Sequence, residues 1–231
     1  MISKISARLQ KIAGFVRFFT LVDIGTDHAL LPIFLLQNGK IDKAVAADVS
    51  CGPLEKGREN AVLHGVFDKI DFVLSDGLAK ITPQNDATCV IAGMGGETVM
   101  SILTAHIDIA KTFPQLILSP QRNVPDVRRF LHMNGFGIVD EAMVLEDGKF
   151  YHILNCVPKP QKPFCAGGYA FGRHLIKAKD PVLRQFIHSE VEKYGKIDTT
   201  ALPAFRQKEI TKYLRLCAKV LEGYDEGESN G

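Results

Sequence analysis

The sequence lacks the features that mark membrane-spanning and secreted proteins. Nowhere in its 231 residues is there an uncharged apolar run of about 18 residues, the length that a transmembrane helix requires. Basic residues recur through the first 19 positions, at Lys4, Arg8, Lys11 and Arg17, so this segment lacks the continuous apolar region of a secretory signal. We therefore expect a cytoplasmic protein without a membrane partner.

Cysteine is also sparse, and its spacing suits neither a disulfide framework nor a zinc site. There are five cysteines, an odd number, and no two of them form a C-x-x-C pair. They are Cys51, Cys89, Cys156, Cys165 and Cys217. We expect a reducing compartment and no bound metal.

Net charge is low for the whole chain but unevenly distributed along it. The formal net charge is +2, and a hydrophobic content of 46% is ordinary for a folded globular protein. Residues 1–158 contain 15 basic and 17 acidic residues, whereas residues 159–221 contain 13 and 5, a net charge of +8. The last ten residues contain four acids and no base. A basic segment suggests a phosphate-rich partner, with a solvated helical face as the alternative.

Three prolines within six residues separate these regions, at Pro158, Pro160 and Pro163, and such a cluster breaks regular structure. We predict one domain over residues 1–158 and a basic helical domain with an acidic tail over residues 159–231. Apolar stripes at helical spacing on both sides of Pro203 predict two helices that pack as an antiparallel pair. A coiled-coil dimerisation element is the alternative, so we expect a monomer or a weak dimer.

Apolar runs and helical periodicities alternate along residues 1–158. The expected strands are 19–24, 43–49, 70–74, 87–92, 116–119, 136–146 and 151–157, and the expected helices are an amphipathic N-terminal segment, 30–37, 54–63, 98–105 and 124–133. This alternation predicts an α/β fold with a mostly parallel sheet covered on both faces. The last two strands have no room for a crossover helix and must form an antiparallel hairpin. The arrangement resembles the Rossmann-like sheet of class I methyltransferases.

Ligands of such sheets bind beyond the carboxyl ends of the strands. The first strand ends in Asp23-Ile-Gly25-Thr-Asp27, which lacks the G-x-G-x-x-G spacing of a dinucleotide site. Two acids beside a single glycine would repel a diphosphate but suit a sulfonium cation. This favours S-adenosylmethionine as the cofactor, with Gly25 allowing close backbone approach and Asp23 holding either the loop or the ammonium of the cofactor.

The next two strands also end in acids. Asp48 can accept hydrogen bonds from both ribose hydroxyls, and Asp76-Gly77-Leu78 would place a carboxylate and backbone N–H groups near the adenine ring. Any one of these acids could instead be a turn or helix-cap residue. Their recurrence at successive strand ends makes a shared ligand site the better interpretation.

The fourth and fifth strands end in glycine-rich and amide-rich loops. Gly93-Met94-Gly95 would let the backbone approach the methionine moiety or a flat base, and the acid- or asparagine-Pro-Pro-aromatic tetrad of many adenine-N6 methyltransferases is absent there. Gln121 and Asn123 could bind base edges, although loop capping is slightly favoured for both.

Five strings together resemble the bacterial TrmK family, the tRNA (adenine-22 N1)-methyltransferases. They are Asp23-Ile-Gly-Thr-Asp-His-Ala-Leu-Leu-Pro32, Ala47-Asp-Val, Ser75-Asp-Gly-Leu78, Ile91-Ala-Gly-Met-Gly-Gly96 and Ser119-Pro-Gln121. The resemblance continues more loosely into the C-terminal part, where the family has a helical, coiled-coil-like domain. Thr26 stands where many members have serine, and Leu30 where many have tyrosine; neither difference removes a charged group.

The resemblance implies methyl transfer from S-adenosylmethionine to N1 of adenine 22 in tRNA. Asp27 is then the candidate catalytic residue, since a carboxylate there could accept a hydrogen bond from N6 and stabilise developing positive charge. His28 is a structural donor or a substrate-positioning residue. Lys4, Arg8, Lys11, Arg173 and Lys177 are candidate phosphate contacts. The alternatives are a methyltransferase of another RNA, a protein or a small molecule, or a non-catalytic nucleotide- or RNA-binding module.

Overall fold

The computed structural model describes residues 5–225, and Lys4, a candidate phosphate contact, lies outside them. Residues up to Pro163 form one compact unit and residues from Phe164 onward form another. None of the helices within residues 5–225 combines the length and hydrophobicity needed to cross a lipid bilayer.

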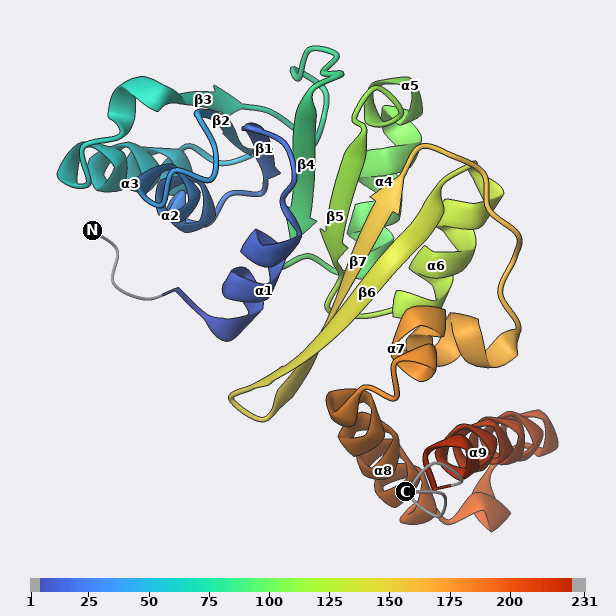
Figure 1. Cartoon of the computed structure of the whole chain (residues 1–231). Coiled ribbons are helices and arrows are strands. Elements are labelled where there is room, and N and C mark those ends of the chain that lie inside the picture. Colours follow the sequence, from blue (N-terminus) through green and yellow to red (C-terminus); the bar gives the residue numbers. More distant parts are fainter. Residues whose placement is uncertain (1–4, 226–231) are drawn as a thin grey trace. The chain divides into compact units, whose positions relative to one another are not determined.

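The first unit contains a seven-stranded sheet with the strand order β3-β2-β1-β4-β5-β7-β6 (Figure 1). Its strands are β1 (Thr20–Ile24), β2 (Lys43–Asp48), β3 (Ile70–Leu74), β4 (Ala87–Ala92), β5 (Gln115–Ser119), β6 (Gly137–Glu146) and β7 (Lys149–Val157). The first five are parallel, and β7 pairs antiparallel with both β5 and β6. The predicted fold class is therefore confirmed, including the closing hairpin.

Helices follow most of the strands. They are α1 (Ala7–Phe15), α2 (Leu30–Gln37), α3 (Cys51–Leu63), α4 (Gly96–Ala105), α5 (Ile107–Ala110) and α6 (Val124–Met133). Residues of α1, α2 and α3 share one buried apolar cluster with residues of β1 and β2, while α4 and α6 contact each other. The strands β1 and β5 bury every residue, because helices cover both faces of a parallel sheet.

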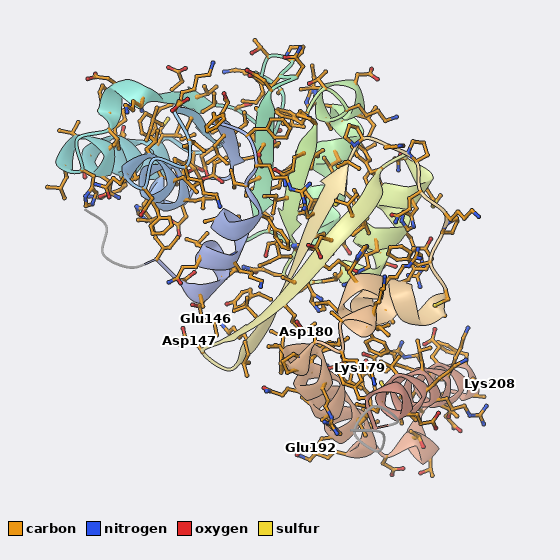
Figure 2. The ribbon with its side chains drawn as sticks, viewed as in Figure 1. Glu146, Asp147, Lys179, Asp180, Glu192 and Lys208 are labelled. Atoms are coloured by element: carbon orange, nitrogen blue, oxygen red, sulfur yellow. The ribbon has the colours of Figure 1, made fainter. Side chains whose placement is uncertain are left out.

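Hydrogen bonds hold α1 at both of its ends. At its start, the backbone N–H of Ala7 donates to the carboxylate of Glu146, which Figure 2 shows at the tip of the β6–β7 hairpin. At its end, the carbonyl of Phe15 accepts a hydrogen bond of 2.8 Å from the Gln115 side chain. Gln115 is buried and also bonds Asn155 at 2.9 Å, so β5 and β7 together fix the position of this helix.

A buried ion pair joins α6 to the hairpin. The Arg128 Nε atom lies 2.7 Å from Glu141 Oε1, and both side chains are fully buried. Arg128 Nη2 lies 3.3 Å from His152 Nδ1. Burial, with the neighbouring guanidinium, holds the pKa of His152 well below its ordinary value, so this imidazole is neutral at physiological pH.

The segment that follows β7 remains packed on the first unit. The Gln161 side chain accepts a hydrogen bond of 2.9 Å from the Ile138 N–H, and the Lys159 carbonyl would lie 2.8 Å from a Cβ atom placed on Gly137. These contacts explain why the compact unit extends to Pro163, a few residues beyond the boundary expected from the prolines.

The second unit is helical throughout its described part. It contains η2 (Gly168–Gly172), α7 (Arg173–Lys177), α8 (Pro181–Gly195), η3 (Thr199–Ala201) and α9 (Ala204–Asp225). The Tyr213 hydroxyl bonds Glu190 at 3.0 Å and the Tyr224 hydroxyl bonds the Asp180 carbonyl at 3.0 Å. Since later residues of α9 meet earlier residues of α8, the two helices run antiparallel around Pro203, as the apolar stripes predict.

Candidate active site

The loop that follows β1 is held in one conformation. Gly25 has a φ of +72°, and the N–H groups of Gly25 and Thr26 both donate to the Ala47 carbonyl, at 2.8 and 3.0 Å. A Cβ atom on Gly25 would lie 2.0 Å from Met94 Cε, so a larger residue would displace the end of this side chain in addition to adopting an unfavourable positive φ. The loop of the fourth strand therefore packs directly onto that of the first.

Two residues directly before α2 have a strained backbone conformation. His28 and Ala29 have φ values of 57° and 55°, in the left-handed region that non-glycine residues rarely adopt. The Asn60 side chain donates to the His28 carbonyl at 3.0 Å and supports this conformation. The result is that Asp27 and His28 project outward at the edge of the site, with side-chain exposures of 83% and 45% and 3.1 Å between Asp27 Oδ1 and His28 Nε2.

The three strand-end acids differ in environment. Asp23 is buried, and burial raises the pKa of its carboxyl from 3.8 to about 6, with the Thr26 hydroxyl and Arg8 opposing the rise and Asp27 and Asp48 adding to it. Asp48 is half-buried, and its Oδ1 accepts a hydrogen bond of 2.8 Å from the Ser50 N–H. Asp76 is exposed.

A cleft of about 490 Å³ opens between these strand ends and α4. Its lining comes from three places. The strand ends contribute Asp48, Ser75, Asp76 and Gly77, and the two packed loops contribute Gly25 and Met94. Helix α4 contributes Glu97, Thr98, Ser101 and Ile102 to the cleft. Its size is within the range of small-molecule sites. A Cβ atom on Gly77 would lie 2.8 Å from Ile102 Cγ2, so this side of the cleft also requires glycine.

The chemistry of the lining suits an adenine nucleoside. Carboxylates on neighbouring strand ends offer acceptors for ribose hydroxyls and for an exocyclic amine. The apolar side chains of Ile24, Val49 and Ile102 offer surfaces for a flat ring. The residues present therefore fit the nucleoside part of S-adenosylmethionine.

A second, smaller hollow of about 50 Å³ shares Gly25 with the cleft. Asp23, Asp27 and Arg8 bring charged groups to it, and Leu9, Leu31 and Ala92 complete the lining. The predicted catalytic residue and most of the residues predicted for cofactor binding thus line one or other of two adjoining hollows.

Four other predicted residues line neither hollow: Leu78, Gly93, Gly95 and Gln121. The Leu78 side chain is buried in the core. Gly95 precedes the first residue of α4, and a Cβ atom on Gly93 would lie 3.5 Å from Arg8 Nη1. Gln121 is exposed and its N–H donates to the Met94 carbonyl at 2.9 Å.

Asn123 caps α6 with a φ of 55°, and its side chain donates to Glu97 Oε1 at 3.0 Å. This contact positions a cleft residue. Asn123 occupies the N-cap position of α6, but its side chain makes no capping hydrogen bond to that helix. Glu97, Thr98 and Ser101 were not anticipated as cleft residues. The sequence contained a signal for them, because Glu97 and Thr98 both lie one helical turn before Ser101, just after the glycine-rich loop Gly93-Met94-Gly95-Gly96.

The predicted phosphate contacts divide between the two units. Lys11 is exposed on α1. Arg173 begins α7, where its guanidinium lies 5.6 Å from the centre of the Phe164 ring, and Lys177 ends the same helix. Within residues 5–225, no group of three or more His, Cys, Asp or Glu side chains is arranged to hold a metal ion.

The strand order and the single antiparallel strand β7, with an acid-lined cleft at the parallel strand ends, define the class I methyltransferase fold. The profile of the TrmK family, tRNA (adenine(22)-N(1))-methyltransferase, matches residues 21–222. The chain belongs to this family, and the resemblance stated from its motifs is confirmed.

Individual relatives agree with this membership. The tRNA (adenine(22)-N(1))-methyltransferase of Bacillus subtilis is 33% identical over 152 residues, which cover 65% of this chain and 64% of that protein, slightly less than two thirds of its length. The crystal structure of Streptococcus pneumoniae Sp1610 has a TM-score of 0.87 and 34% identity, covering 94% of this chain and 100% of that one. A second structure of Sp1610, with a TM-score of 0.86, 34% identity and the same coverage, contains S-adenosyl-L-methionine.

Proposed function

We propose that this protein transfers a methyl group from S-adenosylmethionine to N1 of adenine 22 in tRNA. The observation that carries the proposal is the acid-lined cleft at the strand ends, in a chain whose family profile extends over residues 21–222. The Sp1610 structure that contains S-adenosyl-L-methionine supports the same cofactor here.

We assign the cofactor contacts residue by residue. Asp48 accepts from the ribose hydroxyls, and Asp76 with the backbone of Gly77 and Leu78 binds the adenine ring. Asp23 faces the ammonium group, and the glycines on either side of Met94 allow the backbone to approach. When bound, S-adenosylmethionine supplies an electrophilic methyl group on a positively charged sulfur.

The target nitrogen needs little activation by the protein. Adenine N1 is unprotonated at neutral pH and carries its lone pair in the ring plane, so alignment of the reacting atoms is the main requirement. We assign Asp27 to accept a hydrogen bond from N6 of the target adenine and to stabilise the positive charge of the product. His28, 3.1 Å from Asp27, orients that carboxylate.

The second unit offers a surface for the tRNA backbone. A groove of about 540 Å³ lies along α9 and is lined by Lys208, Lys212 and Arg215, together with Gln207 and Thr211. Figure 2 shows Lys208 on this helix. Cations repeated along one helix face suit a chain of phosphates, and such contacts offset the cost of unstacking the target base. We further propose a monomer or weak dimer in the cytoplasm, where free cysteines and tRNA are both expected.

The test is incubation of the full chain with an unmodified tRNA transcript and labelled S-adenosylmethionine, followed by nucleoside analysis. The expected product is N1-methyladenosine, and a transcript with guanosine at position 22 should give none. N6-methyladenosine, or equal labelling of both transcripts, would overturn the proposal.

A further inference from the structure

The small hollow beside Gly25 carries an unusual combination of charges. Two carboxylates, Asp23 and Asp27, and one guanidinium, Arg8, line a space of about 50 Å³. Asp23 and the Nη1 atom of Arg8 are the buried members of this set. A ligand that satisfies both must present a positive group to the acid and an anionic group to the arginine. An α-amino acid group, with its ammonium and carboxylate on one carbon, has this chemistry.

The Arg8 side chain is partly buried and is positioned to bind a ligand in the hollow. Its Nη1 atom is buried and has no hydrogen-bond partner in the described part of the chain. The carbon of its guanidinium lies 5.2 Å from the centre of the Tyr151 ring, so the side chain rests on an aromatic face. A buried donor without a partner is costly, which indicates that a ligand satisfies it.

The helix that carries Arg8 is itself anchored. Glu146 binds the N–H of Ala7, the residue before Arg8, and Gln115 binds the carbonyl of Phe15 at the other end of α1. The guanidinium is therefore held in place before a ligand arrives, and little ordering remains to be done on binding.

The location of the hollow selects among possible ligands. A tRNA phosphate would meet the repulsion of Asp23 and Asp27, and a neutral base would present no charged group to Asp23 or to Arg8. The hollow adjoins the nucleoside cleft through Gly25, so one molecule can occupy both. In S-adenosylmethionine, the amino acid group is attached to the nucleoside through the sulfur.

We propose that Arg8 binds the carboxylate of the methionyl group of S-adenosylmethionine, with Asp23 facing the adjacent ammonium. Arg8 is then a cofactor-binding residue rather than the phosphate contact expected from its charge. The inference rests on the proposed function, since it assumes the same cofactor in the same cleft.

Two ligands that differ only at the amino acid end test this assignment. S-adenosylhomocysteine carries the ammonium and carboxylate, whereas 5′-methylthioadenosine has the same nucleoside and thioether sulfur without them. Their dissociation constants are measured by calorimetry for the full chain, for Arg8→Met and for Lys11→Met. Lys11→Met is the matched control because it removes an exposed cation from the same helix.

In Arg8→Met we expect S-adenosylhomocysteine to bind about 10- to 100-fold more weakly, the effect of losing a hydrogen bond between charged groups. Methylthioadenosine should bind within about twofold of the parent chain, as both ligands should in Lys11→Met. Retained binding of methylthioadenosine also shows that the variant is folded. Arg8→Lys, which keeps the charge but not the planar fork, should give an intermediate loss for S-adenosylhomocysteine alone.

Equal weakening of both ligands, or of neither, would overturn the assignment. So would an Arg8→Met variant that loses tRNA affinity while binding S-adenosylhomocysteine normally. Failure of the proposed function is distinguishable, because the parent chain would then bind neither ligand or would leave adenine 22 unmethylated.

Discussion

Asp23 connects the stability of the protein to its cofactor site. Its carboxyl is buried beneath the β1 loop, and burial raises its pKa to about 6. The folded state therefore binds a proton on this group more tightly than the unfolded state does. Asp23→Asn removes the buried charge at almost constant shape, so we expect the substitution to stabilise the ligand-free protein while weakening cofactor binding.

The expected change in the free energy of unfolding follows from the pKa shift of Asp23. Each unit of pKa corresponds to about 1.4 kcal/mol, so the change from 3.8 to about 6 corresponds to about 3 kcal/mol. A raised carboxyl pKa stabilises the fold only when the group is protonated. That stabilisation is complete below about pH 4 and is lost as the pH rises to about 6.

Urea unfolding of the parent chain and of Asp23→Asn between pH 4 and 8 measures this effect. The difference in free energy of unfolding should be near zero at the acid end, grow in favour of the variant up to about pH 6, and stay constant above it. The exposed Asp76→Asn is the control and should show no such growth. A less stable Asp23→Asn at pH 7.5, or a difference independent of pH, would refute the reasoning.

Three further results are expected. Asp27→Ala should bind S-adenosylhomocysteine nearly normally but lower single-turnover methylation by about two orders of magnitude, and unchanged turnover would remove Asp27 from catalysis. Arg128→Met should lower the free energy of unfolding by about 3–5 kcal/mol, because Glu141 keeps its buried charge without the ion pair; urea unfolding measures this, and a loss below about 1 kcal/mol contradicts it. Lys208→Gln with Lys212→Gln should weaken tRNA binding and lower its salt dependence, measured by filter binding, without changing S-adenosylhomocysteine affinity; an unchanged salt slope would contradict the role of α9.

Local pattern predicted most of the secondary structure. The strand Ala87–Ala92 lies where its apolar run indicates, because a strand covered on both faces needs continuous hydrophobicity. Helix α3 begins at Cys51 rather than at Leu54. The intervening Gly52-Pro53 suggests a loop, yet proline is tolerated in the first turn of a helix, where its missing N–H breaks no internal hydrogen bond.

Local sequence patterns did not predict which side chains pair with one another in the folded protein. Arg128 and Glu141 lie on different elements, and nothing in their neighbouring residues indicates that both are fully buried. The same holds for Gln115, which joins α1 to β7 through contacts with residues far away in the chain. These pairings depend on which helix crosses which strand, and local periodicity carries no information on that.

The sequence by itself determined the fold class, the family and the acids at the strand ends, because each is written in contiguous residues such as Asp23-Ile-Gly25 and Ser75-Asp-Gly77. Only the tertiary structure decided the position of Arg8. From its charge it resembles any surface cation, but anchoring of α1 to the hairpin and to Gln115 carries it to the hollow beside Asp23. The side chains at a strand end are set by residues contiguous in the sequence. The neighbours of a side chain on a separate helix depend instead on how that helix packs against the whole sheet.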